Sequence, residues 1–164
     1  MMFAGVFVQG VASVRLFRLA EGAAVAAVCG LLVLGCSRAE QKAQQQQSVK
    51  ALALLHGRYL SQHRGQPPAN EADFKKFVQA LSPTELTAFG ATDADSLFVS
   101  PRDKKPLGVV YGTPSGPPGP AGAPVVVYEQ EGKGGKRLVA SSLGAVEEVD
   151  EARFRQLVPA AKSP

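Results

Sequence analysis

Histidine, cysteine and aromatic residues are scarce in this chain. Its 164 residues include two histidines and two cysteines, and 7% are aromatic. On a helix, the seven residues from His56 to His63 rise about 10.5 Å, which is too far for one metal ion with ligand bonds of about 2 Å. We therefore expect His56 to be a partly buried helix residue and His63 a solvated residue of the last helical turn. No serine or cysteine stands in a motif that marks a catalytic nucleophile, so we favour a protein that is not an enzyme.

The sequence also lacks a strong charge of one sign and an apolar run long enough to cross a membrane. Its formal net charge is +4, and no basic block alternates with aromatic residues, which argues against nucleic acid as a partner. The apolar run from Ala23 to Gly35 has 13 residues, whereas a membrane-spanning helix needs about 20. Because Arg15 and Arg18 precede this run, residues 1–35 have the pattern of a removable secretory signal.

The end of the apolar run, Val33-Leu34-Gly35-Cys36, resembles the lipobox of bacterial lipoproteins. The resemblance implies that a peptidase cleaves between Gly35 and Cys36, that the Cys36 sulfur receives diacylglycerol, and that the freed amine is acylated. Cys29 lies in the same run, but the bulky Val28 precedes it. A small residue before the cysteine lets the peptidase approach the backbone, so Cys36 is the better site.

Lipidation of Cys36 implies an anchored protein of the cell envelope that faces the periplasm. Two or three acyl chains give lasting membrane attachment, and Ser37 after the cysteine resembles lipoproteins delivered to the outer membrane rather than retained at the inner one. Cys36 would be the only cysteine left, which excludes a disulfide within one chain. We expect no cofactor other than the covalent lipid. The alternatives are a secretory signal cleaved elsewhere and a short membrane anchor with two incidental cysteines.

The rest of the chain divides into a tether, one domain and a tail. Residues 36–48 are polar and rich in glutamine, so we expect a tether, although they are good helix formers and can extend the helix that follows. Residues 49–158 are predicted to form a single α+β domain. Residues 159–164 are predicted to be a disordered tail.

Three helices are expected in the first half of the domain. Apolar residues recur at helical spacing from Val49 to His63, and Gly65 supplies a stop. A second helix is predicted over Asn70–Leu81, with Asn70 as its cap and Asp73 completing a capping box. A third begins at Ser82-Pro83-Thr84-Glu85, which has a cap, a first-turn proline and a box glutamate, and ends at Gly90.

The second half of the domain has short apolar runs separated by turns, which predicts strands. Leu97–Val99 and Leu107–Tyr111 are two such runs. Residues 112–124 contain four glycines and five prolines and are expected to form an exposed loop. We call this segment the Pro/Gly loop.

A β-hairpin and a last helix are expected to close the domain. Pro124–Tyr128 and Arg137–Ser141 flank a glycine-rich tip at residues 132–135. Val146–Val149 is predicted to be a further antiparallel strand. Asp150 is then expected to cap a helix, with Phe154 packed inward.

This order of elements resembles the pseudopilins of bacterial type II secretion. The resemblance is carried by Leu52–Tyr59 running into His63–Pro68, by the turn segment Ser100–Leu107, and by the closing hairpin from Arg137 to Val146. It implies a long N-terminal helix and short helices packed on an antiparallel sheet of three to four strands. The glutamine-rich tether lies where a pseudopilin has an apolar, filament-packing helix. We therefore expect a lipid-tethered relative of the globular part and not a filament subunit.

Three aspartates, Asp93, Asp95 and Asp103, lie on either side of the run Leu97–Val99. Some pseudopilins bind calcium in a loop near their sheet, and carboxylate oxygens suit Ca²⁺, so the resemblance makes these residues candidate calcium ligands. The segment from Asp93 to Asp95 lacks the glycine and the later glutamate of an EF-hand loop. We favour solvated turn carboxylates without a metal.

Two classes of function remain open on the sequence. The one we favour is a non-enzymatic envelope lipoprotein that binds an unidentified envelope protein through the Pro/Gly loop or the hairpin tip, because loops on a rigid scaffold commonly carry function. The alternative is an envelope-acting enzyme or a small-ligand-binding lipoprotein. That alternative needs a pocket with convergent polar groups, and an enzyme is favoured if His56 lies in a pocket with a carboxylate within hydrogen-bond reach.

Overall fold

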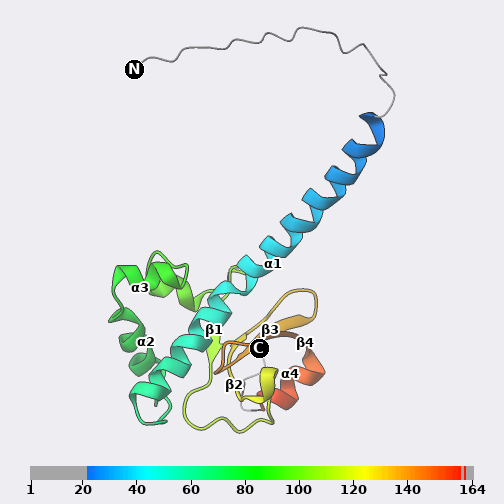
Figure 1. Ribbon diagram of the computed structural model, residues 1–164. Coiled ribbons are helices and arrows are strands. Elements are labelled where there is room, and N and C mark those ends of the chain that lie inside the picture. Colours follow the sequence, from blue (N-terminus) through cyan, green and yellow to red (C-terminus); the bar gives the residue numbers. More distant parts are fainter. Residues whose placement is uncertain (1–21, 160, 162–164) are drawn as a thin grey trace, which may run out of the picture. The chain divides into compact units, whose positions relative to one another are not determined.

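The computed structural model describes residues 22–159 and residue 161, and side chains from Arg38 on. The chain divides into one unit of residues 1–38 and a compact unit of residues 39–164. The compact unit is α+β, as predicted, with a four-stranded antiparallel sheet (Figure 1). The helices are α1 (Gly22–Gln62), α2 (Glu71–Gln79), α3 (Pro83–Ala88) and α4 (Glu151–Leu157), and the strands are β1 (Leu107–Val109), β2 (Val125–Glu129), β3 (Lys136–Ser141) and β4 (Val146–Asp150).

Several predictions at the ends of the chain concern residues that the structure does not describe. Residues 1–21, 160 and 162–164 lie outside the described residues, and the Gly35 and Cys36 side chains belong to the undescribed part of α1. The signal peptide, the lipidation of Cys36 and the disordered tail therefore stay predictions. Within residues 22–159, no helix is long and apolar enough to cross a membrane.

The helix α1 runs through the predicted tether and the first predicted helix without a break. Residues 38–45 are exposed, and burial begins at Val49, which is where the apolar spacing predicted it. The buried face of α1 then packs against α2, α3 and the sheet. The helix ends where Gly65, with a φ of 83°, donates its N–H to the Leu60 carbonyl at 2.7 Å, because glycine adopts this left-handed conformation without strain.

The short helices α2 and α3 begin at the predicted caps. The Asn70 side chain accepts a hydrogen bond from the Asp73 N–H, and Ser82 and Glu85 form a reciprocal capping box. The capping box predicted for Asp73 is wrong, because its carboxylate accepts hydrogen bonds from the Tyr59 hydroxyl at 2.6 Å and from the Ala69 N–H at 3.3 Å. Asp73 therefore joins α2 to α1.

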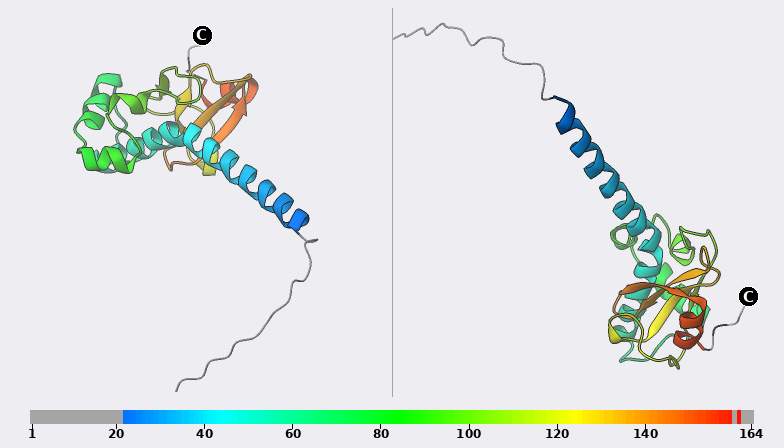
Figure 2. Two further views of the ribbon diagram at one scale, coloured as in Figure 1. Left: turned by 90° about the horizontal axis from the view of Figure 1, so that it is seen from above. Right: turned by 90° about the vertical axis from the view of Figure 1, so that its right-hand side faces the viewer.

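The sheet has the strand order β1-β2-β3-β4, with each strand antiparallel to its neighbours. Alternate side chains of a strand point to opposite faces. Leu138 and Ala140 of β3 belong to the core that contains α1, whereas Val139 between them packs with Phe154 of α4. The sheet thus separates α1 from α4, and Figures 1 and 2 show α2 and α3 on the other side of α1.

The strand expected at Leu97–Val99 is wrong. Asp95–Phe98 forms a 3₁₀ helix, and only Val99 makes an isolated bridge, to Pro106. The Asp93 side chain accepts a hydrogen bond from the Ser96 N–H at 2.8 Å, and the Ser96 hydroxyl donates to the Asp93 carbonyl at 2.7 Å. These local bonds compete with extended pairing.

The Pro/Gly loop is only partly exposed, in contrast to the expectation. Pro120 is buried in a short 3₁₀ turn, Pro120–Gly122. Gly116 lies so close to the Leu157 carbonyl that a Cβ atom there would collide with it. The loop is therefore held against the end of α4.

The closing elements follow the prediction. The strands β2 and β3 form the expected hairpin, and β4 adds the next antiparallel strand. The Asp150 side chain caps α4 by accepting a hydrogen bond from the Arg153 N–H at 2.8 Å. Val149 and Phe154 pack in one cluster on this face of the sheet.

Candidate functional site

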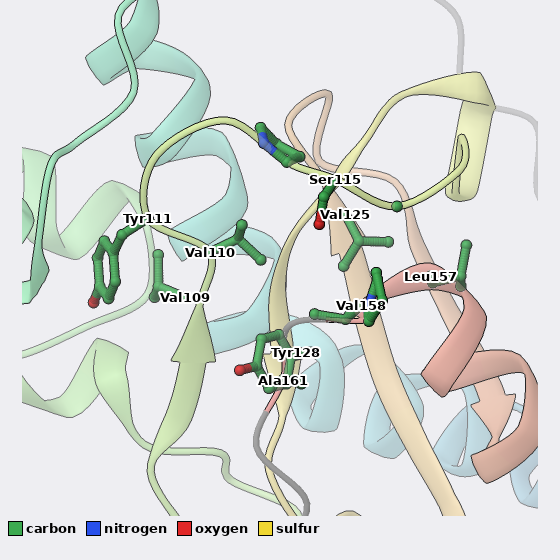
Figure 3. Close-up of a pocket in the computed structure, with 12 residues that line it drawn as sticks. Val109, Val110, Tyr111, Ser115, Val125, Tyr128, Leu157, Val158 and Ala161 are labelled. Carbon is green, nitrogen blue, oxygen red and sulfur yellow. The ribbon is translucent and has the colours of Figure 1, made fainter.

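Two adjoining hollows lie along β1, and together we call them the tyrosine groove. The first, of about 230 Å³, lies between the end of β1, the Pro/Gly loop and the end of α4 (Figure 3). The second, of about 590 Å³, lies between β1 and α2. The two hollows share Val109, Tyr111 and Tyr128.

Tyr128 occupies its place in the groove because its partner in β1 has no side chain. Tyr128 pairs with Gly108, and the phenol ring lies where a Cβ atom of residue 108 would be. The Tyr128 ring also packs on the ring of Phe154, with ring centroids 5.3 Å apart. Glycine in an edge strand thus allows a neighbouring aromatic ring to cover the strand.

The first hollow is lined mainly by apolar residues and by the hydroxyl-bearing residues Tyr111, Ser115 and Tyr128. Among the described residues that line it, none is Asp, Glu, His, Lys, Arg or Cys. Burial raises the pKa of Tyr111 to about 12 and also raises the pKa of Tyr128. Both phenols therefore stay neutral. Tyr128 lies on the side of β1 that carries Val110 and Val158 and can exchange hydrogen bonds with a ligand there, whereas the Tyr111 ring lies beside Val109 on the other side of the strand (Figure 3).

The second hollow has a charged rim on α2. Lys75 makes an ion pair with Glu71 at 2.7 Å, and its ammonium lies 5.5 Å from the centroid of the Phe98 ring. The hydrogen bond that the Lys75 ammonium donates to the Glu71 carboxylate raises the pKa of Lys75, so that this ammonium is charged at physiological pH. The lining of this hollow thus combines apolar residues of β1 with one pair of opposite charges on α2.

The strand β1 borders the second hollow along its whole length. Pro106, Leu107, Gly108 and Val109 all line it. Within the described chain, β1 is an edge strand that pairs with β2 alone. An unpaired strand edge presents N–H and C=O groups on which another extended chain can pair.

The two histidines have different surroundings. His63 is exposed, as predicted, and its ring stacks on Tyr59 with centroids 3.8 Å apart. His56 was expected to be partly buried, but only 1% of it is exposed. His56 lies on the buried face of α1, because Leu52 and Tyr59, its neighbours on the same helix face, are core residues.

A separate cavity of about 190 Å³ lies beside His56, and no carboxylate is among the described residues that line it. The pairing of His56 with an acid, which would favour an enzyme, is therefore not formed in this cavity. Burial lowers the pKa of His56 to about 4 and outweighs a hydrogen-bonding interaction with the Val110 backbone, which raises it. The imidazole is neutral at physiological pH.

The three candidate calcium ligands are not brought together. Asp93 accepts from Ser96, Asp95 accepts from the Gln79 amide at 3.4 Å, and Asp103 accepts from the Lys105 and Gly132 N–H groups at 2.9 and 3.0 Å. The described residues contain no group of three or more His, Cys, Asp or Glu side chains that could hold a metal ion. Asp93 and Asp103 each order their own turn, Asp95 contacts α2, and Asp103 also joins the turn before β1 to the hairpin tip.

The sequence analysis missed a buried ion pair at the C-terminal end of β2, next to Tyr128. Glu129 is fully buried and accepts hydrogen bonds from Arg102 Nη2 at 2.6 Å, from the Ser100 hydroxyl at 2.8 Å and from the Leu138 N–H at 2.8 Å. Arg102 also pairs with Glu148 of β4. A glutamate at an inward position of an apolar strand was the signal available in the sequence. Because all of these partners are saturated within the fold, the pair serves structure.

The comparisons with protein-family models, with curated proteins and with solved structures found no match to this chain.

Proposed function

We propose that this chain is a lipid-anchored protein of the bacterial cell envelope whose domain binds an extended segment of a partner protein. The segment lies in the tyrosine groove and pairs with the free edge of β1. The protein is an interaction module and not an enzyme. The observation that carries the proposal is the free edge of β1, the edge not paired with β2, which borders a hollow of about 590 Å³.

The shape and chemistry of the groove support an extended peptide as the occupant. A strand added to a sheet lies about 4.8 Å from its neighbour and gains affinity from main-chain hydrogen bonds, while its alternate side chains enter pockets. Here the first hollow offers an apolar pocket with the neutral phenol of Tyr128, and the neutral phenol of Tyr111 lies across β1 from it. The second hollow offers the Glu71–Lys75 pair as contacts for polar side chains. An extended segment with an apolar residue next to polar ones matches this arrangement.

The anchoring part of the proposal is supported by the sequence alone. A small residue precedes Cys36 at the end of a short apolar run, and a polar segment follows it. In this proposal, residues 1–35 are removed, Cys36 carries the lipid, and the domain faces the periplasm from the outer membrane. The partner is then another protein of the envelope.

The relation to pseudopilins also stays part of the proposal. It is supported by a long helix whose C-terminal half packs against an antiparallel sheet of four strands. In a lipid-tethered relative, the acyl chains take over the attachment that an apolar helix provides in a filament subunit.

Photo-crosslinking in living cells tests the binding site. A photo-reactive phenylalanine analogue replaces Tyr111, which is half-buried and lines both hollows. As a matched control, the same analogue replaces Arg155, whose side chain is 70% exposed on α4. We expect an adduct from position 111 and none from position 155, with the crosslinked residues of the partner confined to one short segment.

Two results would contradict the proposal. One is the same set of adducts from both positions, which indicates random encounters in the envelope. The other is an adduct from position 111 whose crosslinks fall on a folded helical surface of the partner, which would exclude strand pairing.

A further inference from the structure

The free edge of β1 presents the backbone of Val109 to an added strand. The Val110 N–H donates to the Val126 carbonyl at 2.8 Å, so residue 110 directs its backbone hydrogen bonds toward β2. In an antiparallel pair, successive residues of a strand direct their N–H and C=O groups to opposite edges. The N–H and C=O of Val109 therefore point away from β2, to the edge that borders the second hollow.

The two faces of β1 differ in their surroundings. Val109 belongs to the core that contains α2, whereas Val110 packs in the cluster that contains Tyr128 and α4 (Figure 3). Residues opposite each other on paired strands have their side chains on the same face. A segment residue opposite Val109 therefore points to the α2 side, and its two neighbours point to the Tyr128 side.

The α2 side of the second hollow already holds a cation. The Lys75 ammonium lies 2.7 Å from a Glu71 carboxylate oxygen and 5.5 Å from the centroid of the Phe98 ring. A carboxylate and an aromatic face both attract a cation at these distances. The hydrogen bond to Glu71 and, as a smaller effect, the charge of Asp95 raise the pKa of Lys75. Two carboxylates thus act on one ammonium, and this side of the hollow favours positive charge.

Lys75 can be replaced as the occupant of this place. Its side chain is 40% exposed and that of Glu71 is 61% exposed, and exposed pairs one helical turn apart contribute little to stability. The rings of Phe98 and Tyr111 line the same hollow. An arginine suits such a place better than a lysine, because its planar guanidinium pairs with both oxygens of a carboxylate and stacks on aromatic rings.

We infer that the segment bound at β1 carries an arginine on its α2 side, between two apolar residues; this rests on the peptide binding proposed above. The guanidinium takes the place of the Lys75 ammonium beside Glu71, and Lys75 turns out to solvent. The two apolar neighbours of the arginine lie on the Tyr128 side, where the first hollow is apolar. The partner is thus recognised by a basic residue within an extended apolar segment.

Peptide display on the full chain tests this inference. Cys36→Ser is introduced into every protein used, so that no lipid is attached. Random peptides of about nine residues, long enough for a strand, are selected on the immobilised protein, and we expect enrichment of an arginine between two apolar residues. The enriched peptide is then synthesised with arginine and with citrulline, which keeps the shape of arginine without its charge.

The affinities of the two peptides should depend on Glu71 and Lys75. We expect the arginine peptide to bind more tightly than the citrulline peptide by about five-fold or more, and Glu71→Gln should abolish this preference. Lys75→Ala should tighten binding of the arginine peptide by about two-fold or more, because the competing ammonium is removed.

Two matched variants control for net charge. Glu40→Gln makes the charge change of Glu71→Gln at an exposed position of α1, and it should preserve the preference for arginine. Lys76→Ala makes the charge change of Lys75→Ala at the exposed neighbouring position of α2, which does not line the hollow. It should leave the affinity for the arginine peptide unchanged.

Hydrogen exchange of the Val109 amide distinguishes failure of the arginine from failure of the peptide binding itself. Slower exchange with bound peptide supports pairing at the free edge of β1. If no peptide is enriched, or if bound peptides leave this exchange unchanged, the proposed function is overturned and the arginine with it. The arginine alone is overturned if peptides that slow the exchange carry no basic residue or an acidic one in its place. It is also overturned if the preference survives Glu71→Gln, or if Lys75→Ala does not tighten binding.

Discussion

The buried pair of Arg102 and Glu129 gives the most demanding test of the packing. Arg102→Met keeps most of the apolar stem but removes the guanidinium that donates two hydrogen bonds to Glu129. Glu129 then stays fully buried with only the Ser100 hydroxyl and the Leu138 N–H as donors. Removing one partner of a buried ion pair costs about 3–5 kcal/mol, since the remaining charge is far from water.

Urea unfolding followed by circular dichroism measures this loss. With an m-value of about 2 kcal/mol/M for a small domain, the midpoint should fall by about 1.5–2.5 M urea. The control is Arg155→Met, which removes an exposed pair with Glu151 one turn away and should cost at most about 0.5 kcal/mol. The double variant Arg102→Met/Glu129→Gln should recover part of the loss, because glutamine removes the charge and keeps an acceptor for Ser100. A loss below about 1 kcal/mol for Arg102→Met would refute the reasoning that Glu129 depends on this guanidinium.

Three further predictions concern the groove, the cavity and one helix cap. Gly108→Ala should destabilise the domain by about 1–3 kcal/mol, because the new methyl group displaces the Tyr128 ring; a urea midpoint equal to that of the native chain would disprove the close contact. The His56 pKa falls from 6.5 to about 4 on folding, so the unfolded chain binds more protons than the folded one between these pH values. The free energy of unfolding should therefore decline by roughly 3 kcal/mol as the pH falls from 6.5 to 4. A His56→Phe variant with the same pH dependence would contradict this. Hydrogen bonds from the Ser82 N–H, from Arg58 and from the Ser82 hydroxyl lower the pKa of Glu85 from 4.5 to about 2. The stability that this carboxylate contributes is therefore present above pH 4.5 and is lost as the pH falls toward 2. Glu85→Gln should flatten that part of the acid-unfolding curve, and an unchanged curve would show that the capping box does not hold Glu85 charged.

The features that sequence reasoning found are those that depend on neighbouring residues. Asn70, Ser82 and Asp150 were predicted as caps because a cap is decided within one helical turn. Local chemistry also explains an error: the Asp93–Ser96 hydrogen bonds favour a 3₁₀ helix over the strand that the apolar run suggested. Asp93 and Ser96, which precede that run, were the missed signal.

The candidate site could not be predicted in this way. Its parts come from segments far apart in the sequence, with Glu71 on α2 and Val158 after α4, and only the sheet register places Tyr128 over Gly108. The same holds for Arg102 and Glu129, which are 27 residues apart. Periodicity assigns such residues to a face of an element but does not identify the partner across it.

The lipid on Cys36 is the claim on which the location of this protein and the source of its partner depend. Metabolic labelling with an alkyne analogue of palmitate, in bacteria that express the full chain, measures it directly, with Cys29→Ala and Cys36→Ala compared with the native sequence. We predict label on the native chain and on Cys29→Ala, and none on Cys36→Ala. Label retained on Cys36→Ala, or absent from all three chains, would contradict a lipid-anchored protein.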